Sequence, residues 1–277
     1  MKKNVMLWII AFVITIVTAA YQRLTGPTYP ITGKINLAGN EIEYKLARSH
    51  GGEANHEVKI KIYDSEIAGN LFYKRFKTSD EWQKVPMKNV ENELVGILPH
   101  QPPAGKLQYY IELQKQSLVV KFPMEAPVVI RFKGDVPPYV LIPHIFAMFF
   151  GMMLSTRTGL EFFSDGKNIK KLTIWTLGFL IVGGFILGPI MQKYAFGEYW
   201  TGIPFGHDLT DNKTLIAILG WAIAFIMYKK SKHPKRWALF AAIVLMIVYS
   251  IPHSVLGSEL DYNQLDKENN QIEKINE

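Results

Sequence analysis

Two patterns of hydrophobic and polar positions divide the chain. Apolar residues gather in five long runs, and the segment between the first and second runs alternates instead. The runs cover residues 5–20, 139–154, 172–190, 214–227 and 237–251. A helix needs about 20 mostly apolar residues to cross a bilayer, and flanking Trp, Tyr and small residues can extend a shorter run. The pattern predicts five transmembrane helices, of which the fourth has the least support.

The first run has two interpretations. Lys2 and Lys3 precede it, and Val17-Thr18-Ala19 resembles the small-residue cleavage site of a signal peptide. The flanking charges also suit an uncleaved anchor over residues 1–24, which we favour. Both interpretations export the segment that follows, so the chain has five spans, or four if the first is removed.

Lysine and arginine orient the runs in the membrane. The formal net charge is +7, from 31 basic and 24 acidic residues. If the N-terminus lies inside, the inner segments hold only Glu161 and Asp165 as acids, against eleven basic residues: Lys2, Lys3, Arg157, Lys167, Lys170, Lys171, Lys229, Lys230, Lys232, Lys235 and Arg236. This asymmetry is the positive-inside signal and leaves no basic patch for nucleic acid. We therefore expect a cell-membrane (cytoplasmic membrane) protein with its exported domain and C-terminal tail outside.

Residues 25–137 change to a period of two. Apolar and polar residues alternate at Val58, Ile60 and Ile62, and again from Leu107 to Leu113. Glycine- and proline-bearing turn signals separate such stretches. Short alternating segments with frequent turns predict an antiparallel β-sandwich.

The stretch "LFYKRFKTSDEWQKVPMKNVENELVGILPHQPPAGKLQYYIEL" resembles the middle of a fibronectin type III or immunoglobulin-like module, over roughly residues 56–115. The resemblance implies a fold and no activity, because this fold carries many functions. Trp82 and Tyr109 are expected in its core. His50, His56 and His100 lie near turns and are expected to be solvated.

Missing residues and motifs exclude several kinds of chemistry. The chain has no cysteine, which rules out disulfides, thiolate metal sites, iron–sulfur clusters and c-type haem attachment. No P-loop or kinase-like signature is present, so a nucleotide cofactor is not expected. No run carries a charged residue near its centre, which disfavours an ion pathway.

The segment between the third and fourth runs, residues 191–212, is rich in aromatic residues and turn signals. Its aromatics suit the headgroup zone of a bilayer: Tyr194, Phe196, Tyr199, Trp200 and Phe205. Asp211 or Asn212 is expected to cap the fourth span. A mere connector does not need so many anchors, so we expect a binding surface on the outer rim.

Three histidines are expected at this same outer face. The second run begins "LIPHIF" and the fifth ends "SIPHSV", which places His144, His207 and His253 near span ends. Imidazole and carboxylate together bind transition metals, so the candidate ligands are His144, His207, Asp208, Asp211, His253 and Glu259. His144 and His253 alone could instead flank a haem. The alternative is that these side chains only occupy the membrane interface, since no fixed motif such as HExxH is present.

The predicted architecture is therefore of mixed class. It has an N-terminal transmembrane anchor (1–24), an extracytoplasmic antiparallel β-sandwich (25–137), a four-helix transmembrane bundle (138–255) and a polar outer tail (256–277), disordered or loosely helical. The function expected first is an integral membrane binding or assembly protein that recruits an extracytoplasmic or membrane protein partner. The alternatives are a metal- or haem-binding redox subunit, and then a transporter or ion-coupled subunit. No sharp catalytic motif is present, which disfavours an enzyme acting on its own.

Overall fold

The computed structural model describes residues 2–252, 257 and 259–276. The chain forms two compact units. Met1–Pro27 and Val136–Ser258 make the first, called the helical unit, and Thr28–Asp135 with Glu259–Glu277 make the second, called the β unit. The mixture of an N-terminal helix, several sheets and long apolar helices confirms the predicted class.

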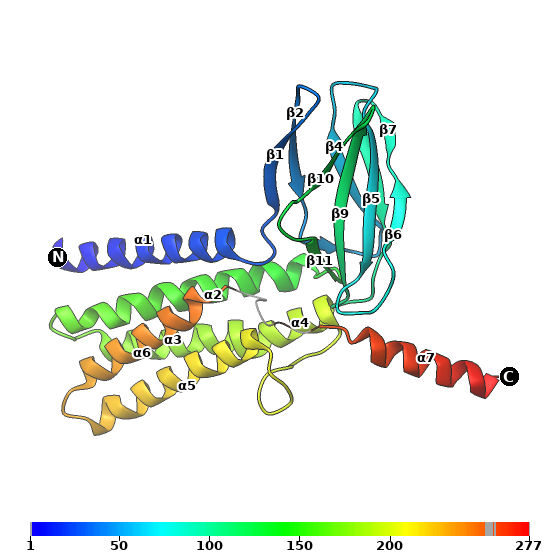
Figure 1. Ribbon diagram of the computed structural model, residues 1–277. Coiled ribbons are helices and arrows are strands. Elements are labelled where there is room, and N and C mark those ends of the chain that lie inside the picture. Colours follow the sequence, from blue (N-terminus) through cyan, green and yellow to red (C-terminus); the bar gives the residue numbers. More distant parts are fainter. Residues whose placement is uncertain (1, 253–256, 258, 277) are drawn as a thin grey trace. The chain divides into compact units, whose positions relative to one another are not determined.

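The helical unit consists of helices that run alongside one another (Figure 1). They are α1 (Lys2–Thr25), α2 (Pro138–Gly159) with its 3-10 extension η1 (Leu160–Phe163), α3 (Ile169–Leu180), the π-helix η2 (Ile181–Leu187), α4 (Gly188–Phe196), α5 (Leu209–Lys230) and α6 (Pro234–Ser250). The third apolar run is thus one continuous helical path of α3, η2 and α4.

Among the described residues, four helices are long and apolar enough to cross a membrane: Lys2–Thr25, Pro138–Phe163, Ile169–Phe196 and Leu209–Lys230. They indicate a membrane protein. The fourth predicted run, which the sequence supported least, is among them. The fifth run forms α6, a shorter apolar helix of 17 residues.

The helical core combines several alanines with larger apolar residues, of which Trp221 is the largest. Trp221 is fully buried, and its indole N–H donates to the Ser155 hydroxyl over 3.1 Å. At Gly159 a Cβ atom would stand 2.6 Å from the Cβ of Ala242, so α2 and α6 approach too closely there for any side chain. Such small-residue contacts are how membrane helices gain packing energy without a hydrophobic driving force between them.

The described residues of the β unit form eleven strands in three sheets. The strands are β1 (Ile31–Leu37), β2 (Asn40–Leu46), β3 (Ser49–Gly51), β4 (His56–Lys61), β5 (Ala68–Arg75), β6 (Gln83–Pro86), β7 (Lys88–Val90), β8 (Glu93–Leu98), β9 (Lys106–Lys115), β10 (Leu118–Phe122) and β11 (Val128–Lys133). β1 pairs with β2, and β4, β8 and β7 form a second sheet. The largest sheet has the order β3-β11-β9-β5-β6, with β10 also on β9 (Figure 1).

All three sheets contribute to one hydrophobic core. On β9, Leu107, Tyr109, Ile111 and Leu113 are almost fully buried, as the alternation predicts. The Tyr109 hydroxyl donates to the carbonyl of Ala47 over 2.8 Å, which satisfies its one polar atom. Burial raises the pKa of this phenol well above its usual value.

The prediction that Trp82 lies in the core is wrong. Trp82 is only half-buried and stands edge-on to Tyr110, with ring centroids 4.8 Å apart. Tyr110 belongs to the opposite face of β9 from Tyr109, because successive side chains of a strand alternate. The sequence shows that Trp82 lies next to a strand. It does not show which face of the sheet the other strands pack against.

Candidate functional site

The loop between α4 and α5, residues 197–208, is fastened by one carboxylate. The Asp211 side chain accepts the backbone N–H groups of Thr201 over 2.7 Å and of Gly202 over 3.0 Å. A Cβ at Gly202 would lie 2.6 Å from the Cβ of Asp211, so this close approach requires glycine. Asn212 accepts the N–H of Ile203 over 2.8 Å in the same way. The beginning of α5 therefore holds the middle of its own preceding loop.

The helix cap is Asp208 rather than the predicted Asp211 or Asn212. Its side chain accepts the N–H of Thr210 over 2.7 Å and that of Asp211 over 3.4 Å, so α5 begins three residues earlier than expected. By residue type alone, either Asp208 or Asp211 could cap the helix. The chain path of the loop decides which carboxylate meets the first free N–H groups of α5.

The tip of this loop exposes large apolar side chains. Phe205 is 82% exposed, and Ile203 and Tyr199 are each 57% exposed. Trp200 instead packs on Phe185, with ring centroids 5.4 Å apart. A fixed backbone that presents apolar groups to the outside has the character of a contact surface.

The predicted metal ligands do not come together among the described residues. No group of three or more His, Asp or Glu side chains there could hold a metal ion. Asp208 accepts backbone N–H groups of the first turn of α5, and Asp211 accepts backbone N–H groups of the α4–α5 loop. Glu259 belongs to the β unit, where it pairs with Lys77 at 3.1 Å and Lys106 at 2.9 Å. These three carboxylates therefore have structural partners.

The predicted histidine ligands have separate surroundings. A ring nitrogen of His144, Nδ1, lies 2.9 Å from the carbonyl oxygen of Gly183 in the π-helix. His207 is exposed on the loop. His253 lies outside the described residues, so the pairing of His144 and His253 around a haem stays a prediction.

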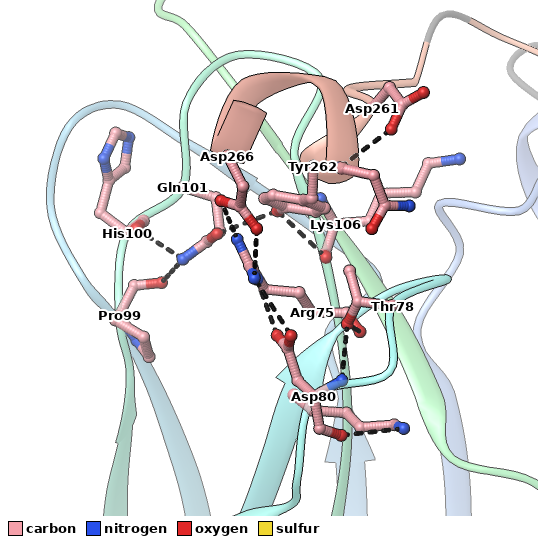
Figure 2. A network of polar contacts seen from close by, with 12 residues as sticks. Arg75, Thr78, Asp80, Pro99, His100, Gln101, Lys106, Asp261, Tyr262 and Asp266 are labelled. Atoms are coloured by element: carbon pink, nitrogen blue, oxygen red, sulfur yellow. Dashed lines mark hydrogen bonds and ion pairs between the residues drawn. The ribbon is translucent and has the colours of Figure 1, made fainter. Parts of the chain in front are cut away.

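The C-terminal tail is bound to the β unit through Arg75 at the end of β5 (Figure 2). Its guanidinium forms two bonds to Asp80, at 2.7 and 3.0 Å, and two to Asp266, both at 2.8 Å. Asp266 lies on α7 (Tyr262–Asn276). These hydrogen bonds from Arg75 lower the pKa of both carboxyl groups. Residues 262–276 of the predicted tail thus form a helix, and its first turns are bound to the β unit, which the sequence did not predict.

Tyr262 anchors the first turn of the same helix (Figure 2). Its ring is 4% exposed and lies under the Arg75 guanidinium, 5.1 Å from the ring centroid. Its hydroxyl oxygen accepts the N–H of Lys106 over 2.9 Å and donates its own hydrogen to Gln101 Oε1 over 2.9 Å. Burial raises the pKa of this hydroxyl to about 12.

A buried ion pair lies at the end of α2. Arg157 and Glu161 are each 1% exposed, and their nearest atoms are 2.7 Å apart. Arg157 also donates to the side chain of Asn4 and covers the ring of Trp8 at 5.4 Å, both on α1. Charged side chains in membrane proteins are costly unless they are paired inside the bundle. This pair therefore ties α1 to α2.

Two histidines of the β unit are paired rather than solvated. His50 Nε2 lies 2.9 Å from the carbonyl oxygen of Ala54, and His50 Nδ1 lies 3.2 Å from His56 Nδ1. Because a carbonyl only accepts, the hydrogen of neutral His50 is on Nε2, and its Nδ1 accepts from His56. Burial, and then the charge of His50, lower the pKa of His56 to about 4.

Known proteins offer no further guide to the function. No protein-family model matches the chain, and no curated protein or solved structure is significantly similar to it. What the chain itself defines is a membrane protein with a β unit, a fastened loop with an apolar tip and a docked C-terminal helix.

Proposed function

We propose that this chain is an integral membrane binding or assembly protein of the cytoplasmic membrane. Its β unit, proposed as a sandwich of the fibronectin type III or immunoglobulin-like kind, and its α4–α5 loop recruit a protein partner on the outer side. The strands of this unit pair antiparallel as predicted, except that β3 and β11 pair in parallel. The helices anchor both elements. Arg157, Asn4 and Trp8 support the view that α1 is an uncleaved member of the bundle, because its removal would leave a buried arginine without two of its neighbours.

Chain connectivity supports the proposed topology. The chain passes between the two units after α1, before α2 and after α6. If α6 also crosses the membrane, the five crossings alternate in direction, and all three passages then occur at one side. The positive-inside asymmetry of the remaining segments makes that side the outer one.

The observation that carries the proposal is the contrast between the fixed base and the open tip of the α4–α5 loop. Asp211 and Asn212 restrain the backbone next to Ile203, while Ile203 and Phe205 remain exposed. Burying a side chain of this size against a partner contributes about 1.5–3 kcal/mol. Little ordering entropy is lost on binding because the loop is already held in place.

Site-specific photocrosslinking in cells tests this proposal. A photoreactive phenylalanine analogue replaces Phe205, and the matched control carries it at Phe163, an exposed aromatic of η1. The proposal expects one discrete protein adduct from position 205 that position 163 does not form. Adducts with lipid alone, or the same protein adducts from both positions, would contradict it.

A further inference from the structure

One face of the largest sheet carries a set of aromatic and lysine side chains. The residues next to this set in sequence, such as Leu71 and Ile111, point into the core. Because successive side chains of a strand point to opposite faces, the set itself points outward. We call it the lysine–aromatic face, and its members are Phe72 and Lys74 on β5, Trp82, Lys84 on β6, Tyr110 on β9 and Lys121 on β10.

Four of these side chains form a row across four strands. Phe72 and Tyr110 are direct cross-strand partners, and their rings stack with centroids 4.8 Å apart and planes 4° from parallel. Lys121 Nζ lies 3.9 Å from the centroid of Tyr110. On the other side of the stack, Lys84 is the β6 partner of Phe72, and its Nζ lies 5.7 Å from that ring. The order is therefore lysine, ring, ring, lysine.

The third lysine is held next to this row. Trp82 stands edge-on to Tyr110, and Lys74 Nζ lies 5.5 Å from the Trp82 ring. Lys74 also donates to the backbone carbonyl of Asp80 over 3.2 Å. Within residues 28–135, all of which the structure describes, no carboxylate forms an ion pair with Lys74, Lys84 or Lys121. Glu112, the β9 partner of Lys121, lies on the same face but forms no ion pair with any of the three lysines. The face thus presents three lysines held by aromatic rings and one carboxylate, an excess of positive charge.

We propose that the lysine–aromatic face binds an acidic polypeptide segment of a partner protein. This inference rests on the proposed function, which makes the partner a protein. It adds the chemistry of the segment that the β unit recognises. Contacts with aromatic rings hold the ammonium groups in place before the partner arrives. The positive rims of the same rings favour carboxylates as well.

The geometry of the rings favours a peptide over a sugar or a nucleic acid. Aromatic residues bind nucleobases through open ring faces on which the ligand stacks. In this sheet the two faces of Phe72 are covered by Tyr110 and Lys84, and those of Tyr110 by Phe72 and Lys121. A ligand that needs flat stacking finds no open face on these two rings. Carboxylates need only the ammonium groups and the ring edges.

Fluorescence anisotropy with the full-length protein in a neutral detergent tests the proposal. The probe is a fluorescein-labelled peptide of alternating glutamate and alanine, with polygalacturonate and anionic lipid vesicles as competing ligands. We expect the peptide to bind, and the combined variant Lys74→Gln, Lys84→Gln and Lys121→Gln to weaken binding at least about tenfold. Phe72→Leu, which changes no charge, should weaken it about two- to fivefold through the lost cation–π contact.

The matched control replaces three exposed lysines elsewhere in the β unit, Lys45→Gln, Lys61→Gln and Lys88→Gln, with the same change in net charge. Its affinity should stay within about twofold of the original. Equal losses in both triple variants would reduce the effect to non-specific attraction and overturn the proposal. Binding of polygalacturonate or vesicles without the peptide would overturn it too. Neither outcome changes the expected crosslinking result at Phe205. The peptide-binding proposal can therefore be wrong while the proposed function stands, and the reverse also holds.

Discussion

His56 shows how one contact changes the chemistry of a side chain. In sequence it is a polar residue beside a turn, but the fold places it against His50 and partly removes it from water. The neutral ring is then favoured, because a positive charge there would be both desolvated and close to a second imidazole. The negative charge of Glu57 raises the pKa of His56, but this effect is smaller than the two that lower it.

The stability of the β unit should therefore depend on pH through His56. An unfolded histidine has a pKa of about 6.5, whereas that of folded His56 is about 4. Between these two values the unfolded chain binds a proton that the folded chain does not. Stability is thus fully present above about pH 6.5 and falls on acidification toward pH 4, by about 1–2 kcal/mol after allowance for the partial exposure of the ring.

Hydrogen exchange of the β4 amides, corrected for the intrinsic effect of pH, measures this change. His56→Gln should remove this part of the pH dependence, whereas His100→Gln should keep it. An unchanged pH dependence in His56→Gln would show that another group is responsible.

At the scale of elements, polar side chains connect helices and strands that lie far apart in the sequence. The sequence places Arg157 and Glu161 in an inner segment between two spans, and the fold buries both of them, with Arg157 against α1. Asp266 was expected on a loose tail, yet it pairs with Arg75. In both cases the partner lies far along the chain, so no local pattern announces the contact.

Removing one member of the buried pair should be far more damaging than removing both. Arg157→Ala leaves the Glu161 carboxylate buried without its counter-charge, and we expect a loss of about 3–5 kcal/mol. The double variant Arg157→Leu with Glu161→Leu should recover most of that loss, because no buried charge remains. Thermal unfolding in detergent, followed by size-exclusion chromatography, provides the comparison. If the double variant were no more stable than Arg157→Ala, the pair would not act as a unit.

At the scale of the whole molecule, the topology can be mapped without background because the chain has no cysteine. Single exposed positions are replaced in turn: Glu125→Cys in the β unit, Asn270→Cys on α7, and Lys167→Cys and Lys232→Cys in the expected inner loops. A membrane-impermeant maleimide should label the first two in intact cells and the last two only after lysis. Labelling of position 167 or 232 in intact cells, or protection of position 125, would reverse or refute the proposed orientation.

Much of the candidate binding surface was foreseeable, but its details were not. The aromatic content of residues 191–212 predicts a surface segment, and Phe205 and Tyr199 are exposed there. The capping residue was misplaced by three positions, because Asp208, Asp211 and Asn212 suit a cap equally well and only the loop path separates them. The grouping of histidines and carboxylates into a metal site rested on a shared membrane side, which does not bring side chains within bonding distance.

The pattern of apolar positions by itself determined the long apolar helices and the strands β4 and β9. A long apolar run indicates a helix that can cross a membrane. Alternating apolar and polar residues indicate a strand with one buried face, as in β4 and β9. Tertiary structure alone decided which face each strand buries and which charges meet. Tyr109 points into the core and Tyr110 toward Phe72 and Lys121, although the two are neighbours in sequence. Arg75 meets Asp266 across 191 residues, because polar pairing depends on distances in space that no local pattern records.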